Sequence, residues 1–77
     1  MYKLKDIQPG MTVVLRNGQR RVVVADGVLQ IDPACGAKYA AGPQLRLDEY
    51  DNRLQHPIPG YDIMAVWDPY IGPLWHE

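Results

Sequence analysis

Met11-Thr-Val-Val-Leu-Arg-Asn-Gly-Gln-Arg-Arg-Val-Val-Val-Ala25 is the stretch that decides the fold. Two runs rich in β-branched residues flank Asn17-Gly18, and this dipeptide tolerates the positive φ angles that a type I′ turn requires. The stretch therefore predicts a β-hairpin. Its register is open: a two-residue loop pairs Val13 with Val22, whereas a three-residue loop that takes in the next residue pairs Val13 with Val23. Both faces carry valine in either register, which fits a closed barrel that packs against something else or a barrel in an oligomer.

Short apolar runs along the rest of the chain predict further strands. They lie at residues 28–31, 44–47 and 61–67, and Pro and Gly turns separate them. Residues 48–54 suit a single helical turn, and no segment is long enough for a crossover helix between parallel strands. We therefore expect an all-β fold, a small SH3-like antiparallel barrel of about five short strands with one helical turn. The barrel domain would span residues 1–69, followed by an aromatic C-terminal tail at 70–77.

The size and charge of the chain limit its function further. Seventy-seven residues allow one domain with a thin core. The net charge is −1, but residues 1–25 carry five basic side chains against one acidic, whereas the remainder carries three basic against eight acidic. Lobes of opposite sign suit self-association or a partner that meets one face. The single cysteine, the lack of a leader and the lack of a ~20-residue apolar run predict a cytoplasmic protein without membrane contact.

Several spaced motifs resemble a known group of proteins. They are Leu4-x-x-Ile7-x-x-Gly10, Leu15-Arg-Asn-Gly18, Leu47-x-x-Tyr50-x-x-x-Leu54 and Tyr61-Asp-Ile63-x-x-Val66-Trp67. This pattern is similar to that of small, mostly uncharacterised SH3-like proteins encoded by bacteriophages and prophages. The resemblance spans residues 4–67, while the Ala/Gly-rich 33–43 segment and the tail depart from it. It implies an accessory phage protein that acts inside the bacterial host, for example by inhibiting a defence complex, and it supplies no catalytic residue.

Residues that could carry out chemistry are few and scattered. Cys35, His56 and His76 lie about twenty residues apart, without the close pairs that a structural zinc site needs. Nothing in the sequence fixes a base beside Cys35, so a nucleophilic role has no support. We therefore expect no enzyme activity, no metal and no cofactor.

Contacts with a protein partner are the favoured function. Aromatic and aliphatic residues gather at the C-terminus, where Trp67, Tyr70, Leu74 and Trp75 resemble the anchors of protein interfaces. The same side chains could instead complete the core, and both roles can coexist. The acidic turn formed by Asp48, Glu49 and Asp51 is a second predicted contact surface for a host protein or complex.

Two alternatives from other functional classes stay open. Arg16, Arg20 and Arg21 cluster at the predicted hairpin tip, and guanidinium groups suit the phosphates of nucleic acid or of a nucleotide signal. The slightly acidic chain argues against a dedicated nucleic-acid binder. The other alternative is a structural homo-oligomer, such as a virion component.

Overall fold

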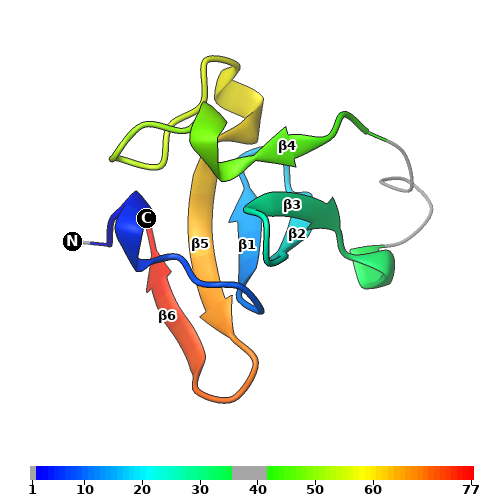
Figure 1. Cartoon of the computed structure of the whole chain (residues 1–77), viewed down its shortest axis with the longest axis vertical. Helices are drawn as coiled ribbons and strands as arrows, with labels where there is room; N and C mark the ends of the chain where they lie inside the picture. The colour runs from blue at the N-terminus through cyan, green and yellow to red at the C-terminus, as the bar shows by residue number, and fades with distance from the viewer. Residues whose placement is uncertain (1, 36–41) are drawn as a thin grey trace.

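The hairpin predicted around Asn17-Gly18 is confirmed in a computed structural model of the chain, which describes residues 2–35 and 42–77. Its strands are β1 (Thr12–Leu15) and β2 (Arg20–Val23), and both lie in the middle of the sheet (Figure 1).

Both predicted registers of this hairpin are wrong, because Val13 pairs with Arg21. The loop has three residues, 16–18, and closes with Leu15 N donating to Gln19 O at 2.8 Å. Gly18 has a φ of 90°, whereas Asn17 is not in the left-handed region, so the type I′ turn does not form. The Asn17 side chain instead accepts the Gln19 N–H at 2.9 Å. This register directs Arg21 toward the core.

Six antiparallel strands form one sheet in the order β4-β3-β2-β1-β5-β6. The strands that complete it are β3 (Val28–Ile31), β4 (Leu45–Arg46), β5 (Ile63–Asp68) and β6 (Gly72–His76). Four 3-10 turns are described, namely η1 (Leu4–Asp6), η2 (Pro33–Cys35), η4 (Leu47–Glu49) and η5 (Pro59–Tyr61). The all-β class is thus confirmed, with a sixth strand where the sequence predicted a tail.

The sheet is open, since β4 and β6 are its edges in the described strand pairing. In Figure 1, β3 and β4 lie to one side of the long strand β5 and run crosswise to its direction, so the sheet is strongly twisted. The predicted barrel closure therefore has no counterpart in the strand ladder among the described residues. No helix in the described parts of the chain is long and apolar enough to cross a membrane.

The core lies on the inner face of the twisted sheet, where every strand but β6 contributes a buried residue. Its buried members are Ile7, Val13, Leu15, Val23, Leu29, Leu45, Tyr50, Leu54, Ile63 and Val66. Leu74 and Trp75 of β6 pack against this cluster from one side. Trp75 also stacks on Tyr2, with 6.4 Å between ring centroids. The last strand thus completes the core with half-buried side chains.

Candidate binding surface

The loop between β5 and β6 is an exposed apolar tip held in a fixed shape. Tyr70 and Ile71, which we call the tip, are 96% and 75% exposed. Asp68 Oδ1 accepts the N–H groups of both residues, at 2.8 Å and 3.1 Å. Gly72 has a φ of 101°, which a side chain would strain. The hairpin projects beyond the rest of the sheet, and the tip lies at its far end (Figure 1).

Trp67 lies next to the tip, on the face of the sheet opposite the core. A bulge in the β5–β6 pairing falls between Val66 and Trp67; Val66 is fully buried, whereas Trp67 is 47% exposed. The indole borders a groove of about 350 Å³ whose lining includes Thr12, Val14 and Arg20.

The predicted partner-binding residues therefore separate into three groups. Trp67 and Tyr70 are exposed on one hairpin, whereas Leu74 and Trp75 are half-buried against the core. The acidic turn at residues 48–51 lies at the opposite end of the molecule from the tip (Figure 1). These residues therefore do not form one continuous surface.

The acidic turn is organised by its own hydrogen bonds. Glu49 Oε2 accepts the Arg46 N–H at 2.7 Å, and Asp48 forms an ion pair with Arg46 at 3.5 Å. Asp51 Oδ1 accepts the N–H groups of Arg53 and Gln55 at 2.8 Å and 3.0 Å. These carboxylates thus close local turns, and the Asp48 side chain is 73% exposed.

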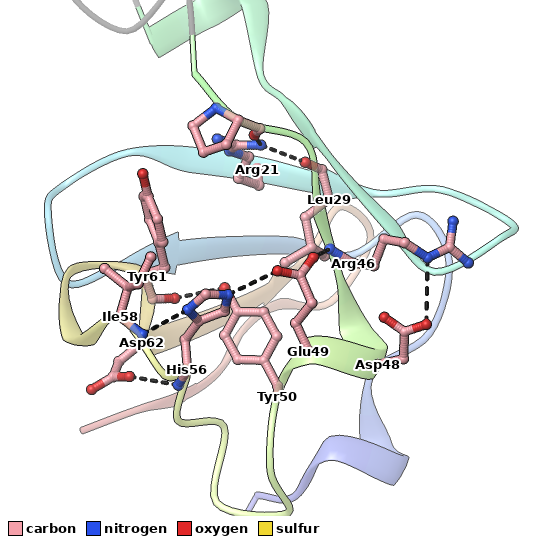
Figure 2. A network of polar contacts seen from close by, with 11 residues as sticks. Arg21, Leu29, Arg46, Asp48, Glu49, Tyr50, His56, Ile58, Tyr61 and Asp62 are labelled. Atoms are coloured by element: carbon pink, nitrogen blue, oxygen red, sulfur yellow. Dashed lines mark hydrogen bonds and ion pairs between the residues drawn. The ribbon is translucent and has the colours of Figure 1, made fainter.

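His56 is the centre of a polar cluster beneath this turn (Figure 2). Its side chain is 5% exposed, and its ring lies edge-on between Tyr50 and Tyr61, with centroids 5.0 Å and 5.3 Å away. The Ile58 N–H donates to Nδ1 at 2.9 Å, so the ring proton is on Nε2, which donates to Glu49 Oε1 at 3.0 Å. This hydrogen bond holds the pKa of Glu49 below its usual range.

Asp62 ties this cluster to the β1–β2 hairpin. Its carboxylate is largely buried. It accepts the backbone N–H of His56 at 2.7 Å and forms an ion pair with the Arg16 guanidinium at 3.2 Å. The Asp62 carbonyl also accepts the Arg16 N–H at 2.8 Å. The sequence does not predict the contact between Arg16 and Asp62, because these residues lie 46 positions apart.

Tyr50 provides a test of this cluster. Its hydroxyl donates to Tyr61 O at 2.6 Å, and burial, helped by the Glu49 carboxylate, raises its pKa well above 10. Replacing Tyr50 with Phe is expected to cost about 1 kcal/mol, since one buried hydrogen bond is lost. The wild type should also lose stability as pH rises above about 10, because unfolded tyrosine ionises there while Tyr50 in the fold stays protonated.

The measurement is urea unfolding at neutral pH and between about pH 9 and 11. The Tyr50→Phe variant should show a shallower alkaline decline, whereas Tyr70→Phe, at a 96% exposed site, should behave as the wild type does. An identical decline in all three proteins would contradict the assigned role of the Tyr50 hydroxyl.

The three hairpin arginines do not form one patch. Arg16 pairs with Asp62 at the turn, and Arg20 lies on the outer face, where it donates to Ala34 O at 3.2 Å. Arg21 points the other way and is 1% exposed. Adjacent residues of a strand face opposite sides, so this separation follows from the register. The three arginines therefore do not form the basic cluster on which the nucleic-acid alternative depended.

Arg21 has become a structural residue of the core. Its guanidinium donates to Leu29 O at 2.8 Å (Figure 2). It also donates to Gln19 Oε1 at 2.7 Å and to Pro43 O at 3.0 Å. Gly42 lies so close that an added Cβ would meet Arg21 Nη2 at 3.1 Å. Arg21 therefore holds the segment before β4 against β2 and β3. The sequence analysis missed this role because it grouped Arg21 with Arg16 and Arg20 as a phosphate-binding cluster.

The residues weighed as metal ligands lie apart. Cys35 ends η2, His56 lies within the polar cluster, and His76 is exposed at the end of β6. Within residues 2–35 and 42–77, no group of three or more His, Cys, Asp or Glu side chains could hold a metal ion. Comparison with protein-family models, with curated proteins and with solved structures finds no match to this chain.

Proposed function

We propose that this protein is a non-enzymatic binding module that inserts its β5–β6 tip into an apolar cleft of a protein partner. The observation that carries the proposal is the pair Tyr70 and Ile71, 96% and 75% exposed on a hairpin that projects from the sheet. The core is closed by other residues, and the tip is not among the side chains that pack against it in the described parts of the chain.

The tip is also rigid, which favours tight binding. The Asp68 carboxylate holds both tip N–H groups, and Pro69 and Pro73 restrict the backbone on either side. Association costs less conformational entropy when the contact residues are ordered beforehand. An aromatic and an aliphatic side chain presented in this way are typical of the few residues that dominate binding energy.

The partner we propose is a protein or complex of a bacterial host, acted on in the cytoplasm. The resemblance of residues 4–67 to small SH3-like phage proteins supports this context, and inhibition of a host defence complex is the activity that it implies. Apolar contacts also distinguish this function from phosphate recognition, because binding through arginine–phosphate contacts weakens steeply with salt.

The test is capture of partners from host lysate at low and high salt, with nuclease present. The wild type should retain its partner at both salt concentrations, and the Tyr70→Ala/Ile71→Ala variant should lose about tenfold or more in affinity for it. Ile58→Ala is the matched control, since Ile58 is 56% exposed but lies in another loop. The proposal fails if the double variant retains the partner, or if salt or nuclease abolishes capture by the wild type.

A further inference from the structure

The turn of the β1–β2 hairpin carries a chemically labile dipeptide. Asn17 and Gly18 are both exposed, and glycine has no side chain to shield its backbone nitrogen. In an Asn-Gly sequence this nitrogen can attack the side-chain carbonyl carbon of asparagine, which closes a succinimide ring and expels ammonia. Water then opens the ring, at one carbonyl to give aspartate or at the other to give isoaspartate. Asparagine is for this reason among the thermolabile residues of proteins.

The folded turn restrains both reacting groups. The nucleophile is the backbone nitrogen of Gly18, and its N–H donates to Leu15 O at 2.9 Å. The carbonyl under attack belongs to the Asn17 side chain, and its oxygen accepts the Gln19 N–H at 2.9 Å. Ring closure has to remove the proton from the Gly18 nitrogen and turn this nitrogen toward the Asn17 side chain. The hydrogen bond to Leu15 must therefore break before the ring can form.

Contacts with the segment before β5 hold this turn in place. Arg16 N donates to Asp62 O at 2.8 Å, and Asn17 N donates to Gly60 O at 3.0 Å. The turn is thus bonded to a part of the chain that is distant in the sequence. A reaction that proceeds only from a transiently opened state follows the population of that state. The reactivity of Asn17 should therefore depend on the stability of the fold rather than on the exposure of its side chain.

The isoaspartate product does not fit the observed register. It routes the main chain through the former side chain, which adds one carbon atom to the backbone of the three-residue loop. This loop closes with Leu15 N donating to Gln19 O at 2.8 Å, in the register that places Val13 opposite Arg21. Loop length and register are linked in a hairpin. A chain with isoaspartate at position 17 therefore loses the alignment that buries Arg21.

We propose that Asn17 is a latent modification site that converts unfolding of the hairpin into irreversible loss of the fold. While the hairpin is closed, the side chain is held back from reaction. In the open chain, succinimide formation and hydrolysis yield isoaspartate, and this product cannot return to the native register. Water is the only co-reactant that the two steps need. The proposal concerns the β1–β2 turn and is independent of the partner that the tip binds.

The first test compares the rate of isoaspartate formation in buffer and in urea at mildly alkaline pH. Peptide mapping by mass spectrometry locates the product, and labelling by an isoaspartyl methyltransferase quantifies it. Asn17 of the wild type should react at least about 100-fold more slowly in buffer than in urea. Asn52 is the internal control, because it is also exposed but the side chain of Arg53 hinders attack, so it should react slowly in both. Equal rates at Asn17 in the two conditions would mean that the Gln19 N–H activates the carbonyl, and they overturn the proposal.

The second test is recovery of the fold after unfolding, followed by tryptophan fluorescence. Wild type held in urea for increasing times and then diluted should lose refolded protein in step with the isoaspartate formed. Asn17→Ser is the matched control, since its hydroxyl can accept the Gln19 N–H but it has no amide to cyclise. Its recovery should stay constant over the same period. Isoaspartate-containing chains that refold, or an Asn17→Ser variant that loses recovery as fast as the wild type, overturn the proposal.

Discussion

Replacing Arg21 with alanine is expected to lower the free energy of unfolding by about 3–5 kcal/mol, because several buried acceptors lose a charged donor and a large buried side chain is removed. The side chain is 1% exposed, and its three described hydrogen bonds end on Gln19, Leu29 and Pro43. Truncation leaves those oxygens buried without a donor and opens a cavity beneath them. Domains of this length have a total of about 4–12 kcal/mol, so a loss of this size removes roughly a quarter or more of the stability.

Arg20→Ala is the matched control for this experiment. The two arginines are neighbours in β2, but Arg20 is exposed on the outer face. Its substitution should cost no more than about 1 kcal/mol in urea unfolding. Equal effects at the two positions would contradict the observed register, because they would mean that Arg21 is not inside.

Leu54→Ala is the second substitution with a large expected effect, about 2–5 kcal/mol. Leu54 is 1% exposed and lies in the core, yet it has a φ of 66°. For a leucine this backbone conformation costs roughly 1–2 kcal/mol, which side-chain burial offsets. Glycine removes the same side chain without the backbone penalty. Leu54→Gly should therefore be about 1 kcal/mol more stable than Leu54→Ala.

Leu15 provides the comparison for this unusual order. It is equally buried but lies in β1, outside the positive-φ region. There glycine should be worse than alanine by about 0.5–1 kcal/mol, the usual order. Urea unfolding of the four variants tests both pairs, and the same order at both positions would show that the backbone of Leu54 carries no strain.

The sequence predicted the hairpin and the all-β class because those depend on local residues. β-branched runs around Asn17-Gly18 are sufficient for two paired strands. Register is a different problem, since valine on both faces makes each alignment equally apolar. The observed register of β1 and β2 goes with a three-residue loop in which Gly18 alone takes a positive φ. In this register Arg21 reaches its buried partners, such as the Leu29 carbonyl.

The candidate surface could be predicted only in composition. The aromatic residues concentrated after position 66 lie on β5, β6 and the loop between them, but their sequence does not show which of them face solvent. Which of these side chains face solvent depends on the bulge between Val66 and Trp67 and on the turn that Asp68 holds. The contact of Asp62 with Arg16 and His56 is likewise tertiary, because it joins segments that are distant in the sequence.

The open sheet has a consequence for aggregation. Unpaired edge strands are templates on which other chains can stack into cross-β fibrils. Here one edge, β4, has two residues, and the other, β6, begins with Gly72-Pro73. Proline has no N–H to donate, and two residues offer too short a ladder for stable addition. The folded protein should therefore resist fibril formation even when it is concentrated.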